Sequence, residues 1–222
     1  MAKKTIPTVG DNDNTTRQSR GKFPIYANKV NIVVIGVSTG GPNALECVIP
    51  KLPANFPVPI VIVQHMPAEF IRPLVDRLNR ISTLKVLEAT HEQIISPGRV
   101  YFAPGGKHLT IKKVNLTTTI VKINDDPPEN SCKPAVDVLF RSAANEFEKH
   151  TLAVVMTGMG NDGVKGGKQI VDAGGQLIIQ DKKSSVVWGM PGGIAEAGFA
   201  SGIYPLNSLA KEIYDRVLVG RF

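Results

Sequence analysis

The sequence predicts a doubly wound α/β domain, with a mainly parallel sheet that carries helices on both faces and a β-hairpin insertion. From residue 31 onward, short apolar runs alternate with amphipathic segments. The runs are apolar throughout, as is typical of parallel strands buried on both faces. The longest of them are far shorter than a bilayer crossing requires. These observations favour a layered α/β fold and argue against a membrane-spanning chain.

The main predicted strands are apolar runs bounded by turn-forming residues. In chain order they span residues 31–37, 58–64, 84–89, 152–157 and 176–180. A β-rich stretch between the third and the fourth comprises residues 99–103, 109–114 and 117–123. Its last two runs alternate apolar and polar residues and predict a hairpin, so we expect the insertion near residues 100–124.

The predicted helices have apolar residues spaced three or four apart. They span residues 42–51, 68–80, 135–149, 164–173, 191–197 and 208–219. The first begins with Pro42, a residue favoured in the first turn of a helix. In the second, Phe70, Leu74 and Leu78 share one face, which we expect to be buried.

Composition indicates one folded domain preceded by a polar tail. Hydrophobic residues make up 42% of the 222 residues and charged residues 20%, which excludes a disordered chain. More than half of the net charge of +7 lies in the first 30 residues, so the body offers no dense basic surface for nucleic acid. We expect residues 1–28 to be a flexible tail or linker remnant and residues 29–222 to form the domain.

Cellular location and redox state are also constrained by the sequence. The N-terminus lacks the apolar core of a signal peptide, so we expect a cytoplasmic protein. The two cysteines, Cys47 and Cys132, are too few for a disulfide framework or a zinc site and are expected to be reduced thiols.

Ligands of open parallel sheets bind in the loops that follow the carboxyl ends of the strands. The first such loop, residues 36–42, reads Gly-Val-Ser-Thr-Gly-Gly-Pro and fits the G-x-S-x-G spacing of a nucleophile elbow. Small residues there let the hydroxyl of Ser38 stand clear at a helix N-terminus. The same glycines could instead cradle a phosphate, and Ser38 could only cap the helix. The loop by itself supports these three interpretations equally.

A histidine, His65, follows the second predicted strand in the segment Gln64-His65-Met66-Pro67. Taken alone, it is better explained as a packing or capping residue at the next helix start. If the first two strands are adjacent, however, Ser38 and His65 leave the sheet at the same edge, where a serine needs a base. His91, His108 and His150 lack such a placement, and we expect structural roles for the last two.

The third loop, residues 157–163, lies between a predicted strand and a helix and reads Thr-Gly-Met-Gly-Asn-Asp-Gly. Its glycines at 158, 160 and 163 match G-x-G-x-x-G, and Asp181 follows about 20 positions later. A nicotinamide dinucleotide-binding oxidoreductase is therefore the rival interpretation. Against it, the carboxylate of Asp162 would repel a pyrophosphate in that loop. In a hydrolase the same carboxylate would orient a histidine and stabilise the imidazolium.

Ser38, His65 and Asp162 thus come from three strand-end loops and are expected to meet at one edge of the sheet. Their chain order is not that of the α/β-hydrolase fold, so the serine motif does not imply that fold. A triad is defined by geometry and roles rather than by order. A non-catalytic interaction module is the third alternative, and the complete set of three residues argues against it.

At these residues the sequence resembles the catalytic domain of the chemotaxis protein-glutamate methylesterases, the CheB family. The resemblance runs from about Val30 to about Val217. Its motifs occur in order and at family-like spacing, at residues 35–42, 64–67, 101–108, 134–140, 157–163 and 189–191. By this resemblance the family's nucleophile falls on Ser38, its histidine on His65 and its aspartate on Asp162. Its oxyanion-binding positions fall on Thr39 and Met159.

The resemblance implies a methylesterase catalytic domain that acts on the cytoplasmic helices of methyl-accepting chemoreceptors. The implied reaction hydrolyses glutamate methyl esters to release methanol, with deamidation of receptor glutamines as a second activity. We expect no metal, no organic cofactor, no nucleic-acid partner and no membrane insertion, and a monomeric protein. Most members of the family also carry an N-terminal receiver domain, whereas only about 28 residues precede the resemblance here. A catalytic domain separated from its receiver and a relative without one both fit this sequence.

Overall fold

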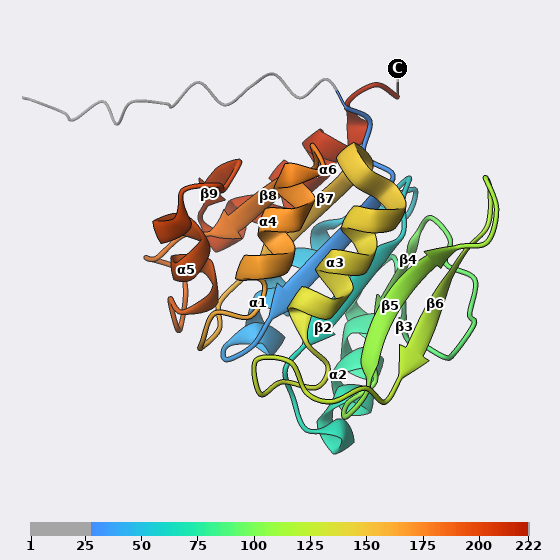
Figure 1. The fold of residues 1–222 in the computed structure, drawn as a ribbon, viewed down its shortest axis with the longest axis horizontal. Coiled ribbons are helices and arrows are strands. Elements are labelled where there is room, and N and C mark those ends of the chain that lie inside the picture. Colours follow the sequence, from blue (N-terminus) through green and yellow to red (C-terminus); the bar gives the residue numbers. More distant parts are fainter. Residues whose placement is uncertain (1–27, 222) are drawn as a thin grey trace, which may run out of the picture.

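The computed structural model describes residues 28–221, which are built around a parallel sheet (Figure 1). Its strands are β1 Ile32–Val37, β2 Ile60–Gln64, β3 Lys85–Glu88, β4 Arg99–Phe102, β7 Thr151–Val155, β8 Gln176–Gln180 and β9 Gly202–Tyr204. They lie in the spatial order β3-β4-β2-β1-β7-β8-β9, and every neighbouring pair is parallel. The predicted adjacency of the first two strands is confirmed.

Helices cover both faces of this sheet. They are α1 Gly41–Val48, α2 Ala68–Ile81, α3 Val136–Phe147, α4 Val164–Asp172, α5 Met190–Ala197 and α6 Leu206–Leu218. In Figure 1, α3 and α4 lie in front of the sheet, and α1, α2 and α6 lie behind it. The doubly wound α/β class predicted from the sequence is therefore confirmed.

The two faces of β1 show why its sequence is apolar throughout. Val33 and Ile35 belong to the core under α1, α2 and α6, whereas Ile32 and Val34 belong to the core under α3 and α4. All four side chains are fully buried. Alternate residues of a strand point to opposite faces, so a strand between two helical layers needs an apolar residue at every position.

The predicted insertion is smaller than expected from the sequence. β4 belongs to the main sheet between β2 and β3, where Val100, Tyr101 and Phe102 are fully buried. The hairpin itself consists of β5 His108–Lys113 and β6 Thr119–Asn124, which form a separate antiparallel sheet. This sheet packs on α3. β9, which adds an edge strand beside β8, has only three residues and was not predicted because so short a run shows no periodicity.

Two helix predictions also need correction. The helix expected over residues 42–51 ends at Val48 and continues as a 3-10 turn, Ile49–Lys51. Pro50 lacks the N–H that an α-helix would need at this position. In α2, Leu74 and Leu78 are buried as predicted, but Phe70 is 55% exposed. Phe70 lies in the first turn of the helix, just after the carboxyl end of β2.

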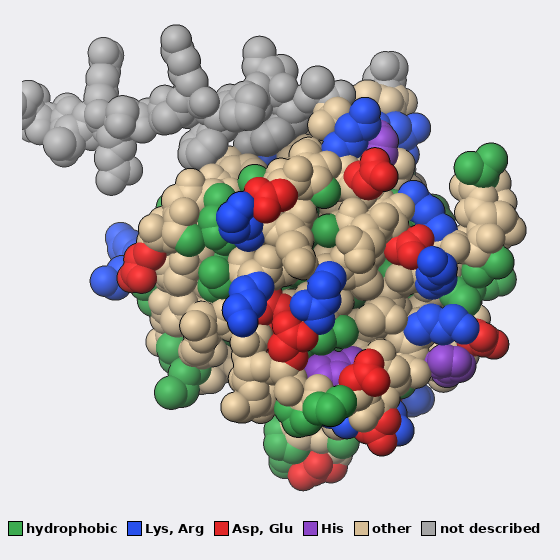
Figure 2. All heavy atoms as spheres, in the orientation of Figure 1, with side chains coloured by type: hydrophobic (Ala, Val, Ile, Leu, Met, Phe, Trp, Pro, Cys, Tyr) green, Lys and Arg blue, Asp and Glu red, His purple; other side chains and the backbone are tan. Residues whose placement is uncertain are grey.

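On the face shown in Figure 2, acidic and basic side chains are interspersed rather than gathered by sign. None of the helices within residues 28–221 combines the length and the apolar character that a bilayer crossing needs. The predicted tail, residues 1–28, falls outside the described residues except for Asn28.

Candidate active site

The carboxyl ends of β2, β1 and β7 lie side by side because β1 pairs with both of the others. Ser38 directly follows β1, and His65 directly follows β2. Backbone hydrogen bonds continue past the strand ends: the Ser38 amide donates to the Thr157 carbonyl, and the His65 amide to the Val37 carbonyl, both at 3.0 Å. The three loops expected to carry the site therefore begin at the same edge of the sheet.

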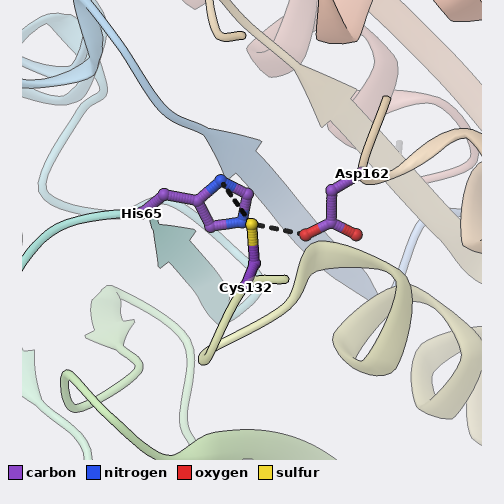
Figure 3. A group of neighbouring side chains, drawn as sticks. All are labelled: His65, Cys132 and Asp162. Atoms are coloured by element: carbon purple, nitrogen blue, oxygen red, sulfur yellow. Dashed lines mark hydrogen bonds and ion pairs between the residues drawn. The ribbon is translucent and has the colours of Figure 1, made fainter. Parts of the chain in front are cut away.

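His65 and Asp162 form a close, largely buried pair. The Nε2 of His65 lies 2.8 Å from Oδ2 of Asp162, and the two side chains are 12% and 3% exposed. Figure 3 shows the carboxylate of Asp162 and the thiol of Cys132 both next to the imidazole, with the sulfur drawn over the ring. Because Nε2 is engaged by the carboxylate, Nδ1 is the ring nitrogen left for another partner.

The carboxylate of Asp162 is held by three donors besides His65. Its Oδ2 accepts from the Val136 amide at 2.6 Å, and its Oδ1 accepts from the Asp137 amide and from Asn130 Nδ2, both at 2.9 Å. The two amides open α3, where backbone N–H groups lack intrahelical partners and favour negative charge. Burial alone would raise the pKa of Asp162, but the hydrogen bonds from His65 and these two amides hold it below its usual value. Asp162 is therefore a charged, fixed partner for His65.

A second buried carboxylate, Asp137, supports the same region. Its Oδ1 accepts from the amides of Gly163 and Gly166, at 3.0 and 2.7 Å, and its Oδ2 accepts from Asn130 Nδ2 at 2.8 Å. Burial is the main cause that raises the pKa of Asp137 above its usual value. These glycine amides open α4, which is where a pyrophosphate would bind in the dinucleotide interpretation. Asp137 already occupies them, so the geometry argues against that rival.

Gln64 holds the Ser38 and His65 segments together. Its Nε2 donates to the carbonyl of Ser38 at 3.0 Å and to that of His65 at 2.9 Å. The side chain is buried, and its Oε1 lies where a Cβ on Gly41 would collide with it, only 2.0 Å away. Gln64 was quoted as part of a motif but was not predicted to have this role. A polar residue at the end of an otherwise apolar strand was the available signal.

Ser38 is half-buried and lies against the loop that follows β7. A Cβ added to Gly158 would come within 2.8 Å of the Ser38 Cβ, so this close approach requires glycine. Within residues 28–221, the Ser38 hydroxyl makes no hydrogen bond, either to His65 or to another residue. Catalytic hydrogen bonds are often long in ligand-free structures and shorten when substrate binds.

Thr39 directly follows Ser38, Met159 follows Gly158, and Thr157 links their two loops. Thr157 Oγ1 donates to the Thr39 carbonyl at 2.9 Å and accepts from the Val187 amide at 3.0 Å. Both Thr39 and Met159 are exposed, the latter to 75%. In the described part of the chain neither of their amides donates a hydrogen bond. Two unpaired backbone N–H groups thus lie on the loops next to Ser38.

Two further residues of the site come from the loop before α3 and were not predicted. Asn130 joins Asp137 to Asp162 as described, and Cys132 places its Sγ 3.7 Å from His65 Nδ1. Asn130 has a positive φ of 53°, a conformation that asparagine tolerates better than most residues. Burial and the charge of Asp162 raise the pKa of the Cys132 thiol. His65, Cys132 and Asp162 each offer one potential metal ligand within 4.8 Å of the others.

The other residues considered in the sequence have structural roles. His108 is buried, accepts from the Ala135 amide at 3.2 Å and donates to the Pro127 carbonyl at 3.1 Å. His150 donates to the Lys29 carbonyl at 2.7 Å. Asp181, the acidic residue of the dinucleotide interpretation, accepts from the Ser184 amide in the turn after β8.

Comparisons with known proteins agree with this geometry. Residues 33–213 match the family model described as CheB methylesterase. A protein-glutamate methylesterase/protein-glutamine glutaminase of Trichodesmium erythraeum is 48% identical over 91% of this chain and 57% of its own length. A protein of the same name from Desulfotalea psychrophila is 48% identical over 87% of this chain and 53% of its own length. This chain thus spans about half the length of the curated relatives it matches.

A solved structure extends the match to three dimensions. The crystal structure of the Thermotoga maritima CheB methylesterase catalytic domain superposes with a TM-score of 0.82 at 41% identity. The match covers 84% of this chain and 98% of the other. With the sequence motifs, the family model and the fold in agreement, the chain belongs to the CheB methylesterase family.

Proposed function

We propose that this chain hydrolyses glutamate methyl esters on the cytoplasmic helices of chemoreceptors, and deamidates receptor glutamines at the same site. The observation that carries the proposal is the hydrogen bond between charged, buried Asp162 and His65, at the edge of the sheet where Ser38 leaves β1. The names of the relatives support both reactions. The same substrate implies action in the cytoplasm.

In this mechanism His65 removes the Ser38 proton while Oγ attacks the ester carbonyl carbon. Nε2 donates to Asp162, so Nδ1 accepts the proton, and Asp162 stabilises the resulting imidazolium. The two ring nitrogens thus have the reverse of their roles in the serine-protease template. A charged carboxylate is required for this step, and the lowered pKa of Asp162 supplies it at neutral pH.

The tetrahedral intermediate carries its negative charge on the former carbonyl oxygen. We assign its stabilisation to the backbone amides of Thr39 and Met159, which lie on the loops next to Ser38. Removing one such donor in a hydrolase costs about 100-fold to 1,000-fold in turnover. The C–O bond to the methoxy group then breaks, and methanol leaves with the proton from His65. Water, deprotonated by His65, hydrolyses the glutamyl-serine ester, restores the Ser38 hydroxyl and releases a glutamate carboxylate.

The rim of the site supports a substrate carried on a folded protein surface. Exposed apolar side chains lie on the loops next to Ser38, where Met159 and Val186 are 75% and 68% exposed. Phe70, in the first turn of α2 after β2 and His65, is 55% exposed. Val186 lies against the Ser38 loop, since a Cβ added to Gly40 would come within 2.7 Å of the Val186 Cβ. A side chain on a helical bundle can reach only a shallow site, and an exposed apolar rim is the kind of surface that binds a protein partner.

The test is methanol release from a methylated receptor fragment, with ammonia release from its glutamine form as the second assay. We expect both activities with the unmodified chain, and neither with the Ser38→Ala variant. Absence of methanol release by folded protein from several methylated receptors would refute the substrate assignment. Sedimentation of the active protein tests the accompanying expectation of a monomer.

A further inference from the structure

Each of the two assigned oxyanion donors shares a peptide unit with a carbonyl group that is itself held by two hydrogen bonds. In a planar trans peptide the C=O of one residue and the N–H of the next point in opposite directions, so fixing the carbonyl also fixes the N–H. The Gly158 carbonyl, which shares a unit with the Met159 N–H, accepts from the amides of Gly189 and Met190, both at 2.9 Å. Two amides at the start of α5 therefore set the direction of the Met159 N–H.

The Ser38 carbonyl, which shares a unit with the Thr39 N–H, is held in the same way, but one of its two donors is a side chain. It accepts from the Gly41 amide at 2.8 Å and from Gln64 Nε2 at 3.0 Å. Gln64 is only 1% exposed, whereas Thr39 lies at the surface. The Thr39 N–H therefore points away from the buried Gln64 amide, which is the direction that a ligand site at the surface requires. Without that amide, the peptide unit would keep one anchor instead of two.

Folding stability alone explains Gln64 poorly. It ends β2, whose other four residues are apolar and buried. Its Oε1 has no hydrogen-bond partner within residues 28–221, and a buried acceptor left unpaired lowers folding stability. The same atom excludes a side chain at Gly41, where a Cβ would lie only 2.0 Å from it. What the side chain does achieve is to hold two carbonyls with Nε2, those of Ser38 and His65. These contacts point to a role in the site rather than in the core.

We propose that Gln64 is a positioning residue for the oxyanion site: it holds the Ser38–Thr39 peptide so that the Thr39 N–H is aimed at the oxygen of the tetrahedral intermediate. Its amide contacts two backbone carbonyls, so it acts through the peptide and not on the substrate. Oxyanion donors must lie about 2.7–3.1 Å from the place where the oxyanion forms, so a small rotation of the peptide weakens the interaction. The inference rests on the proposed function, because it takes the Thr39 amide as one of the two oxyanion donors.

The test is the Gln64→Met variant, in which an unbranched apolar side chain of similar length removes the donor. We expect kcat for methanol release from a methylated receptor fragment to fall about 10-fold to 100-fold, the scale of a misplacement of about 1 Å. KM should stay within about twofold, because an interaction made only in the transition state contributes to kcat and not to substrate binding. A purely structural role would instead lower the melting temperature and leave kcat of the folded variant unchanged.

Gln176→Met is the matched control for lost stability. Gln176 is also a buried glutamine of the sheet whose amide has one atom, Nε2, without a partner in the described chain. It begins β8, at the opposite edge of the sheet from the site, and accepts from Arg216 at 2.7 Å. We expect this variant to melt at a lower temperature with unchanged kcat. Gly41→Ala perturbs the Gln64 amide by a second route, because its Cβ displaces Oε1, and should lower kcat as Gln64→Met does. Thermal melting verifies that each variant is folded.

Phenylboronic acid gives a readout that does not depend on the receptor substrate. The Ser38 Oγ–B bond forms, the hydroxyl proton passes to His65, and the tetrahedral adduct carries its negative charge where the intermediate does. We expect Gln64→Met to weaken boronate binding by about the same factor as it lowers kcat. Equal boronate affinity in the two proteins, no boronate binding by the unmodified chain, or a changed KM at constant kcat would overturn the role of Gln64. A chain that binds the boronate but releases no methanol would instead refute the proposed substrate, and the boronate titration would still decide the role of Gln64.

Discussion

Replacing Asp162 by Asn changes one buried group that the proposed mechanism requires to be charged. The carboxylate accepts four hydrogen bonds and donates none. An asparagine side chain accepts at only one of its two positions, so its NH₂ group must face two donors. On the Oδ1 side these are the Asp137 amide and Asn130 Nδ2, and on the Oδ2 side they are the Val136 amide and His65 Nε2.

The orientation with NH₂ toward His65 is the less costly one, because an imidazole can change its tautomer and a backbone amide cannot. His65 would then accept at Nε2 and carry its proton on Nδ1. In that tautomer Nδ1 cannot take the Ser38 proton. The corresponding change in the serine-protease template lowers turnover about 10⁴-fold, which equals about 5.4 kcal/mol of transition-state stabilisation. The Val136 amide remains unpaired, which costs about 1–3 kcal/mol of folding stability.

Two measurements on the Asp162→Asn variant check this reasoning: kcat for methanol release, and the free energy of unfolding from urea denaturation. Asp181→Asn is the matched control, since Asp181 also follows a strand of the sheet but uses only Oδ1 as an acceptor, from Ser184. Asparagine can keep those bonds, so we expect unchanged turnover and stability. A folded Asp162→Asn protein with turnover within about tenfold of the unmodified chain would refute the role of the carboxylate.

Four further predictions follow from the site. Ser38→Ala should abolish methanol release with little change in melting temperature, because its hydroxyl makes no hydrogen bond within the described residues; substantial residual turnover would exclude Ser38 as the nucleophile. Turnover should rise with pH as His65 loses its proton, and a profile flat from acid to neutral pH would contradict a histidine base. Folding lowers the pKa of Asp162, so its carboxylate stabilises the protein at pH values above the usual aspartate pKa. This stabilisation is lost as the pH falls through the lowered pKa. The raised pKa of Asp137 contributes with the opposite sign, and the charge of Asp162 is one of its causes. The difference in unfolding free energy between the unmodified protein and Asp162→Asn, measured against pH, therefore reports the loss of Asp162 together with a lowered pKa of Asp137. Deletion of residues 1–28 should leave melting temperature and turnover unchanged, and a shortened chain that fails to fold would show that the domain begins earlier.

Sequence periodicity was sufficient to predict the elements that bury the most apolar surface. The strand predicted over residues 176–180 coincides with β8, and that over 31–37 differs from β1 by one residue. Apolar continuity reports burial on both faces, which is a local property of each segment. The same pattern placed Ser38 and His65 at strand ends, and the parallel sheet then brought those ends to one edge.

Only the tertiary structure decided which strands pair with each other and which residues contact the site. The sequence pattern of β4 does not distinguish a strand inside the main sheet from part of an insertion. The three-residue strand β9 is defined only by its pairing with the edge of β8. Motif spacing indicated Asp162 but not the hydrogen-bond donors that fix its carboxylate and keep it ionised. Those donors come from α3 and from the loop before it.

Cys132 shows the same limit most clearly. In the sequence it is one of two ordinary thiols, 67 positions away from His65. Its position beside Nδ1 depends on the loop that Glu129 and Arg141 hold against α3. Periodicity records which side of an element is buried. The distance between two side-chain atoms on separate loops depends instead on how separate elements pack, and only the folded chain determines that distance.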